Sequence, residues 1–237
     1  MKAINKNTKI AVTCLSIFAS LVMSTKAFSG QVEINQIEEA ASVLNVAELK
    51  VMSESFAGYD KALGLYRLGL SHSLMGDNES AKVAIDASMV VLEKLAEEES
   101  NNVEVKALLA QVYGFKISLE PLKGAYYGMK SSSLLNEAES LAASNPRVQL
   151  VKGIAKYNTP PMFGGGQDDA KEAFEKAIVA FEQDEYSNFH WGEAEAYTWL
   201  GLIKHQQGDK ASAQADWEKA LTINPNYGWP KMLLEKK

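Results

Sequence analysis

The chain has 237 residues, a formal net charge of −6 and a pI near 5.3. This acidic balance excludes a general nucleic-acid binder, which needs a basic surface to displace counterions from phosphates. The single cysteine excludes a disulfide framework and any CxxC zinc site.

Residues 1–29 predict a secretory signal peptide. Three lysines precede the uncharged, mostly apolar run 10–23, and small residues lead to Ser29. The run is shorter than the roughly 20 residues that a membrane span needs. We expect cleavage after Ser29, with cleavage after Ala27 or a retained N-terminal anchor as the alternatives. We interpret Cys14 as part of this discarded segment rather than as a lipoprotein cysteine.

Removal of the leader changes the chemistry of the chain. The leader carries four lysines and no acidic residue, so the net charge of the remaining 208 residues falls from −6 to −10. No cysteine remains, which suits an oxidising compartment. We therefore expect an acidic periplasmic protein without a stable membrane span. At this size it should bury about 70% of its unfolded surface and fold without disulfide bonds or a structural metal.

The rest of the chain predicts helices only, because no stretch shows sustained two-residue alternation with β-branched residues. Pro230 suits the first turn of a short closing helix, which would cover the apolar face of the last repeat. The expected helices are 31–54, 60–75, 78–98, 102–118, 125–143, 146–157, 168–183, 192–207, 210–222 and 230–235.

The clearest repeat unit lies at residues 192–227. Small residues at Gly201 and Ala213 let the two helices of the pair approach closely, and large residues such as Tyr197 and Trp217 are expected to fill the space between repeats. A glycine makes the turn between the helices and a proline stops the second helix. The signature positions of this unit are Tyr197, Leu200, Gly201, Gly208, Ala213, Trp217, Ala220 and Pro225.

Three upstream units repeat the pattern less regularly. The unit at 60–98 carries Gly69, Gly76 and Ala81, and the unit at 146–183 carries Gly153, Ala170, Phe174 and Ala177. In the weak unit at 102–145, Gly114 takes the place of the close-approach glycine. The corresponding glycines of the four units are 45, 39 and 48 residues apart, so the array is degenerate and contains insertions.

These units resemble the tetratricopeptide repeat (TPR), and the leader with NPR at 145–147, PPMFGGG at 160–166 and WGEAEAY at 191–197 resembles small secreted bacterial proteins of that family. The resemblance implies an all-α, right-handed superhelix of antiparallel helix pairs. It implies about four degenerate repeats in a single domain over residues 30–237, with an N-terminal helix and a C-terminal capping helix. The concave face of such a superhelix binds extended peptides or partner proteins, and no reaction is implied.

The segment 159–166 is the most unusual candidate site. It interrupts a helix pair with Pro160, Pro161 and three glycines around Met162 and Phe163. Prolines restrict φ and glycines permit close backbone approach. Two interpretations remain open: the apolar pair forms a binding element on a surface loop, or it packs back between repeats.

Aromatic residues mark two further candidates. Tyr126 and Tyr127 lie between glycines in the second insertion, where they could stack on a ligand or pack the start of a helix. Trp191 begins the last repeat, where it could bind a ligand at the inner face or staple the helix start. The two insertions, 121–131 and 159–167, are expected to reshape or block the groove.

Other chemistries are disfavoured. Gln167-Asp168-Asp169 follow the glycines where a phosphate loop needs Lys and Ser/Thr. The three histidines are scattered and make no HxxxH pair, so we expect no metal. No serine lies in a GxSxG setting, and we predict no enzymatic activity and no cofactor.

The leading hypothesis is a periplasmic scaffold or adaptor that binds a protein or peptide in a concave TPR groove. A small apolar ligand is the alternative, by analogy with TPR components associated with TRAP-transporter solute uptake. A purely structural envelope component is the third class. Convergence of Tyr126, Tyr127, Phe163 and Trp191 on one enclosed cavity would favour the ligand, and burial of all loop aromatics would favour the structural role.

Overall fold

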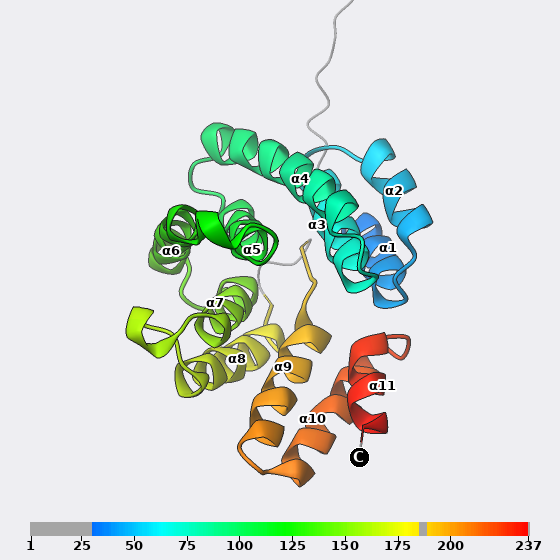
Figure 1. Cartoon of the computed structure of the whole chain (residues 1–237), viewed down its shortest axis with the longest axis vertical. Helices are drawn as coiled ribbons and strands as arrows, with labels where there is room; N and C mark the ends of the chain where they lie inside the picture. The colour runs from blue at the N-terminus through cyan, green and yellow to red at the C-terminus, as the bar shows by residue number, and fades with distance from the viewer. Residues whose placement is uncertain (1–29, 185–188, 237) are drawn as a thin grey trace, which may run out of the picture.

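The computed structural model describes residues 30–184 and 189–236, so the expected signal peptide and Cys14 lie outside the described residues. The described residues form α-helices and two short 3₁₀ turns, without a strand, which confirms the all-α prediction (Figure 1). The elements are α1 (Gln31–Ser42), α2 (Val46–Ser55), α3 (Gly58–Leu74), α4 (Asn78–Glu98), α5 (Val103–Leu119), η1 (Pro121–Lys123), α6 (Gly124–Leu141), α7 (Pro146–Asn158), η2 (Pro161–Phe163), α8 (Gln167–Phe181), α9 (Glu193–Gln206), α10 (Lys210–Ile223) and α11 (Gly228–Glu235).

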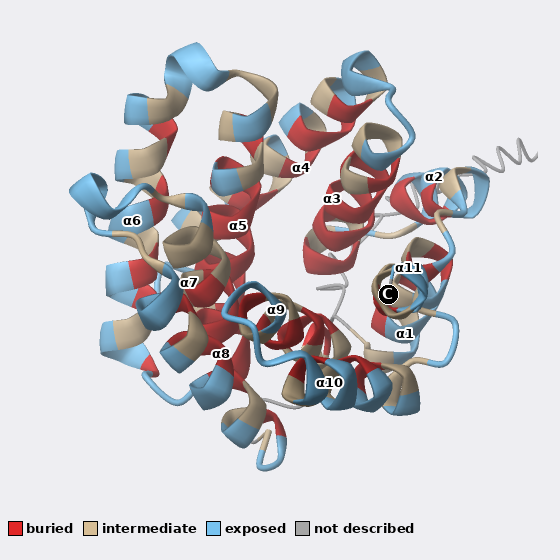
Figure 2. Ribbon diagram, turned by 60° about the horizontal axis from the view of Figure 1, so that its bottom comes forward, coloured by how far each residue is buried: buried red, intermediate tan, exposed pale blue. Residues whose placement is uncertain are grey.

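The helices pack in sequential pairs around a common centre (Figure 1). The pairs are α3–α4, α5–α6, α7–α8 and α9–α10, with α1 and α2 against α3 and α11 against α10. The first helix of each pair lies inside and the second lies outside. Helix α5 is buried along most of its length, whereas α4, α6 and α8 are buried on one stripe only (Figure 2).

Side-chain caps explain where several of these helices begin. The caps of α4 and α10 are Asp77 and Asp209, and each carboxylate accepts a hydrogen bond from a backbone N–H three residues on. Asn102 and Asn145 cap α5 and α7 in the same way, each accepting from two N–H groups. The first N–H groups of a helix have no carbonyl acceptor within that helix, and these side-chain oxygens accept their hydrogen bonds instead.

The predicted single helix at 31–54 was wrong, because the chain turns at 43–45. Leu44 adopts a left-handed conformation with φ of 55°. The N–H groups of Leu44 and Asn45 donate to the carbonyls of Ala41 and Ala40, which ends α1. The Asn45 side chain then accepts from Glu48 N and caps α2.

Glycine permits close helix approach in three of the four pairs. A Cβ at Gly69, Gly153 or Gly201 would lie 2.5–2.7 Å from the side chain of Ile85, Phe174 or Trp217 on the partner helix. The close approach at these glycines matches the repeat signature. Trp217, which was expected between repeats, instead packs on Gly201 inside its own pair and donates to the Thr198 carbonyl of α9.

The assignment of Gly114 to the same role was wrong, because nothing lies within 4 Å of a Cβ placed there. In the α5–α6 pair the small residues are on the second helix instead. A Cβ placed at Gly124 or Gly128 would lie 3.5 or 3.9 Å from the nearest side-chain carbon of Ile117. Both distances are ordinary van der Waals contacts, so the packing of this pair does not require glycine at either position.

Alanine substitutions at Gly153, which is closely packed, and at Gly114, which is open, should change the stability in opposite directions. We expect Gly153→Ala to destabilise the fold by about 1–3 kcal/mol, because its methyl group overpacks the fully buried Phe174 ring. We expect Gly114→Ala to stabilise it by about 0.5–1 kcal/mol, because alanine favours the helix and the site is open. Urea unfolding of both variants measures the difference, and an equal loss in both would contradict the packing described.

Within residues 30–184 and 189–236, none of the helices combines the length and the apolar character needed to cross a membrane.

Candidate functional site

The inner space of the helix array is occupied by the chain's own segment 189–192, which leads into α9 (Figure 1). The indole Nε1 of Trp191 donates to the hydroxyl of Tyr59 on α3 at 2.8 Å, and Trp191 is only 3% exposed. Phe189 packs edge-on against Tyr59 at 4.8 Å between ring centroids. The side chain of Gln31 on α1 donates to the carbonyl of His190 and accepts from its N–H, both at 2.8 Å.

A buried arginine joins the first repeat to the last. Arg67 of α3 forms two bonds to Glu38 of α1, at 2.7 and 3.0 Å, and one to Glu195 of α9 at 3.1 Å. Its guanidinium carbon also lies 5.3 Å from the ring centroids of Tyr66 and Trp191. This ion pair therefore bridges the inner faces of α3 and α9, and the concave groove is filled at this point by residues 189–192 rather than by the insertions 121–131 and 159–167.

A second buried arginine ties the middle repeats to the same segment. The Arg147 side chain of α7 is fully buried and bonds Glu104 of α5 at 2.6 Å. Its two terminal nitrogens also form a bidentate ion pair with the Asp184 carboxylate, at 2.8 and 3.0 Å. Asn145 donates to the other Glu104 oxygen at 2.6 Å. These bonds compensate charges that would otherwise be costly to bury.

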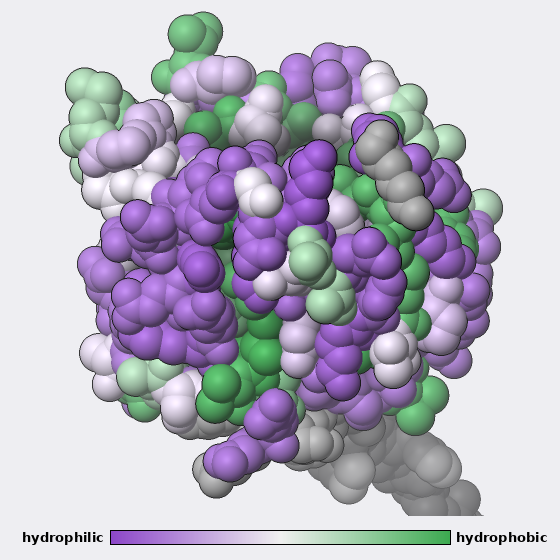
Figure 3. All heavy atoms as spheres, turned by 90° about the horizontal axis from the view of Figure 1, so that it is seen from below, coloured by the Kyte–Doolittle hydropathy of each residue, from purple (hydrophilic) through white to green (hydrophobic). Residues whose placement is uncertain are grey.

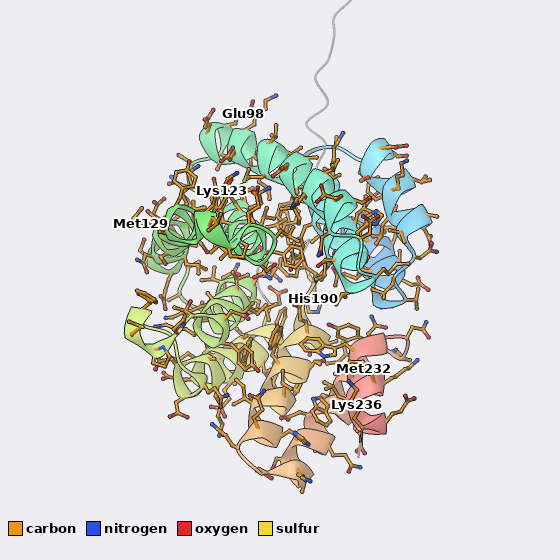
Figure 4. The ribbon with its side chains drawn as sticks, in the orientation of Figure 1. Glu98, Lys123, Met129, His190, Met232 and Lys236 are labelled. Carbon is orange, nitrogen blue, oxygen red and sulfur yellow. The ribbon has the colours of Figure 1, made fainter. Side chains whose placement is uncertain are left out.

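His190 continues this network toward the centre of the molecule (Figure 4). Its Nδ1 lies 2.9 Å from Asp184 and its Nε2 lies 3.4 Å from Glu193. Hydrogen bonding to Glu193 raises the pKa of His190 above 6.5, burial opposes the rise, and Asp184 adds to it. Burial acts to raise the pKa of Asp184, but Arg147 and His190 outweigh it and hold that pKa low.

The raised pKa of His190 predicts a pH-dependent contribution to stability. A group whose pKa is higher in the folded state stabilises that state fully below its unfolded pKa, near 6.5. The contribution is lost as the pH rises through the folded pKa. We therefore expect the difference in melting temperature between the native protein and His190→Gln to shrink as the pH rises from 5.5 to about 8. A difference that grows with pH would contradict this arrangement.

The insertion at 159–166 forms an ordered turn rather than an open loop. The N–H groups of Phe163 and Gly165 donate to the carbonyl of Pro160 at 2.9 and 3.3 Å, which closes η2. A Cβ at Gly165 would collide with the carbonyl oxygen of Thr159. Only glycine fits at position 165, where the backbone passes directly over Thr159, and this explains one of the three consecutive glycines.

Lys156 of α7 holds the far side of the same turn. Its Nζ donates to the carbonyl of Gly164 at 2.6 Å and lies 3.3 Å from the Asp169 carboxylate, and its carbonyl accepts from Gly166 N at 3.0 Å. Gly164 has a φ of 83°, in the left-handed region that favours glycine. The turn therefore has a defined backbone geometry.

This turn presents apolar side chains to solvent. Met162 is 83% exposed and Phe163 is 72% exposed, and Pro160 and Pro161 are exposed beside them. The interpretation in which Met162 and Phe163 pack back between repeats is therefore contradicted. The prolines and glycines set the turn, and the two large apolar groups point away from it.

The other aromatic candidates separate into exposed and buried residues. Tyr126 is 53% exposed, whereas Tyr127 is buried and stacks on Tyr113 with centroids 5.6 Å apart. With Trp191 buried in the centre and Phe163 exposed on η2, the four aromatics do not converge on one enclosed cavity. The exposure of Tyr126 and Phe163 also contradicts the structural hypothesis, in which the loop aromatics are buried.

Two depressions in the described surface are open to solvent. One lies between α7 and α8 and is lined by charged side chains, including Lys152, Lys156 and Lys176. The other lies between α4 and α6 and is lined by apolar and acidic side chains. Among the residues that the structure describes, no three His, Cys, Asp or Glu side chains are grouped to hold a metal ion.

The residues that close the inner face were not among the sequence candidates. Arg67 and Glu195 are 128 residues apart in sequence, and Glu104 and Arg147 are 43 apart. A signal for them exists in the pattern, because each is a charged residue within a helix that is otherwise rich in apolar and small residues. Such charges are rarely buried unless they are paired.

Comparisons with known proteins agree with the helix-pair architecture. Residues 194–227, which include α10 and all of α9 except its first residue, match the family described as tetratricopeptide repeat. The chain matches none of the curated proteins. A similar solved structure is the HusA haemophore from Porphyromonas gingivalis, with a TM-score of 0.55 and 20% identity over 77% of this chain and 96% of that one.

Two further solved structures have lower TM-scores. A thermophilic TPR protein from Thermus thermophilus, TTC0263, has a TM-score of 0.47 and 16% identity, covering 82% of this chain and 89% of that one. MamA has a TM-score of 0.40 and 23% identity, covering 63% of this chain and 74% of that one. The fold is a TPR-like right-handed superhelix, as predicted, and its inner face is filled by its own chain.

Proposed function

We propose that this chain is a non-enzymatic, periplasmic scaffold that binds a partner protein through the η2 turn. The observation that carries the proposal is the exposure of Met162 and Phe163 on a turn whose backbone is fixed by hydrogen bonds. Large apolar side chains on an ordered surface turn are typical of interaction sites. A preformed turn also lowers the entropy lost on binding.

The filled inner face directs the proposal to the outside of the superhelix. The surface seen from the α10 side is mostly hydrophilic, with narrow apolar bands between polar ridges (Figure 3). The turn between α3 and α4 also exposes an apolar pair, Leu74 and Met75, and η1 exposes Leu122. Three of the four turns within helix pairs therefore expose apolar side chains. Of these, the η2 turn exposes the largest single side chain, Phe163.

The signal peptide expected at residues 1–29 supports the periplasmic location. The similarity to HusA concerns the fold alone, and the candidate aromatics of this chain do not meet around an enclosed cavity. We therefore favour a protein partner over a small apolar ligand.

Affinity capture from the native envelope tests this proposal. The tagged protein is compared with Met162→Ala/Phe163→Ala and with Val83→Ala/Val179→Ala, which truncates two exposed valines on α4 and α8. All four side chains are solvent-exposed, so both variants should fold like the native protein. We expect a specific partner whose recovery falls about tenfold or more with the η2 variant, as for a binding hot spot. Equal recovery with both variants would contradict the proposal.

A further inference from the structure

The η2 turn is too small to hold a partner protein by itself. A stable protein–protein interface involves about 20–30 residues and roughly 800 Å² on each side. The insertion 159–167 has nine residues, and its large exposed apolar side chains are Met162 and Phe163. A partner that binds η2 must therefore also contact a neighbouring part of the surface.

On one side, η2 is next to the turn between α9 and α10. Gln167 donates to Gln206 at 2.8 Å and Gln207 donates to Asp168 at 3.3 Å, so this turn lies against the start of α8. The turn itself, residues 207–209, is polar and exposed. Exchanging a hydrogen bond with water for one with a partner gains little free energy, so this neighbour adds little to binding.

On the other side, η2 is next to α6, because α6 packs against α7 and η2 follows α7. Figures 1 and 4 share one orientation and show η2 and Met129 of α6 on the same outer side of the molecule. Leu122 on η1 is 103% exposed, and Met129 and Tyr126 are 71% and 53% exposed. We call these three side chains the η1–α6 stripe, since residues three and four apart lie on one face of a helix.

Exposed side chains of this kind are concentrated at η2 and the stripe. Nine leucine, methionine, phenylalanine and tyrosine side chains are exposed within residues 30–184 and 189–236, and five of them belong to these two places. The other four are divided among the α3–α4 turn, the end of α6 and α11. Adjacent large apolar groups on a polar surface are typical of interaction sites, whereas single ones are not.

The charges beside the stripe are balanced within this chain. Lys123 pairs with Glu120 at 3.2 Å, and Lys130 pairs with Glu93 at 3.1 Å. A partner therefore meets apolar surface here without an excess of either charge, and apolar contact rather than charge would recognise it.

We infer that the partner bound at η2 also covers the η1–α6 stripe, with one continuous, apolar and uncharged face. This inference rests on the proposed function and extends its site to the adjacent helix pair. Neighbouring helices pack with their axes about 8–10 Å apart, so a face of ordinary interface size reaches both places. A second copy of this chain is a poor occupant, because two copies that each carry the expected net charge of −10 repel one another.

Photo-crosslinking of the full chain in its native envelope tests whether one partner covers both places. A photoreactive phenylalanine analogue replaces Phe163, Met129 or, as the control, Leu141, which is 47% exposed at the opposite end of α6. Positions 163 and 129 should give adducts with the same protein, identified by mass spectrometry, and position 141 should give none.

The crosslinking outcomes separate the two proposals. An adduct from 163 without one from 129, or with a different protein from 129, would overturn the shared interface and leave binding at η2 intact. An adduct of this chain with itself would overturn the choice of a different protein as the occupant. Absence of any adduct from 163 would contradict the proposed function and the inference with it.

A pair of matched variants measures how much the stripe contributes. Leu122→Ser/Met129→Ser should lower recovery of the partner about tenfold, as for binding hot spots. Leu141→Ser/Val179→Ser removes two exposed apolar side chains at the opposite ends of α6 and α8 and should change recovery less than about twofold. Recovery should also change less than about twofold between roughly 0.05 and 0.5 M salt. Equal losses in both variants, or a large loss with salt, would overturn recognition by the apolar stripe.

Discussion

Replacement of Arg147 by alanine is expected to destabilise the protein by about 3–5 kcal/mol. The guanidinium is fully buried and holds Glu104 and Asp184 on opposite sides. Its removal leaves two buried carboxylates without their main partner, and burial already raises the pKa of Glu104. The free energy of unfolding, measured in urea at neutral pH, tests this expectation.

Two controls separate the buried charge from the loss of packing. Lys94→Ala removes a lysine from an exposed pair, in which the Lys94 ammonium lies 3.7 Å from Glu98, and should cost less than about 1 kcal/mol. The triple variant Arg147→Met/Glu104→Gln/Asp184→Asn removes the charges together and should recover part of the stability lost in Arg147→Ala. An Arg147→Ala loss as small as that of Lys94→Ala would contradict the role assigned to the cluster.

Trp191→Ala is expected to destabilise the protein by about 3–5 kcal/mol through a cavity at the centre of the superhelix. The indole is almost completely buried between α3 and the start of α9. The substitution also removes the hydrogen bond to Tyr59 and the aromatic face next to Arg67. Thermal and urea unfolding measure the effect.

Trp191→Phe provides the matched comparison, because it keeps an aromatic ring and loses the indole donor. We expect a smaller loss for Trp191→Phe than for Trp191→Ala. If Trp191→Ala were as stable as the native protein and lost partner binding, Trp191 would be a contact residue on an open groove. That outcome would contradict the filled inner face.

The sequence was sufficient to predict the helix pairs. Gly201 opposite Trp217, the turn at Gly208 and the cap at Asp209 are local features, and their spacing determines how two adjacent helices pack. The break at Leu44 was missed because a left-handed backbone is usually predicted from glycine, and this position is a leucine. The open space at Gly114 was missed because Gly114 occupies the position expected in the sequence pattern.

The closure of the inner face could not be predicted from local patterns. It depends on Arg67 meeting Glu195 and on Gln31 meeting His190, pairs separated by 128 and 159 residues. The candidate loop was identified from its composition, since prolines and glycines around Met162 and Phe163 are unusual within a helix pair. The exposure of that pair depends on hydrogen bonds made by the Lys156 ammonium and the Pro160 carbonyl, which composition does not reveal.

Site-specific photo-crosslinking in the native envelope tests the central claim most directly. A photoreactive phenylalanine analogue replaces Phe163 on the η2 turn or, as the control, Gln214 on the exposed face of α10. We predict a covalent adduct with one partner protein from position 163 and none from position 214. Adducts of equal yield from both positions, or no adduct from 163 under conditions in which the partner is still captured, would contradict binding through the η2 turn.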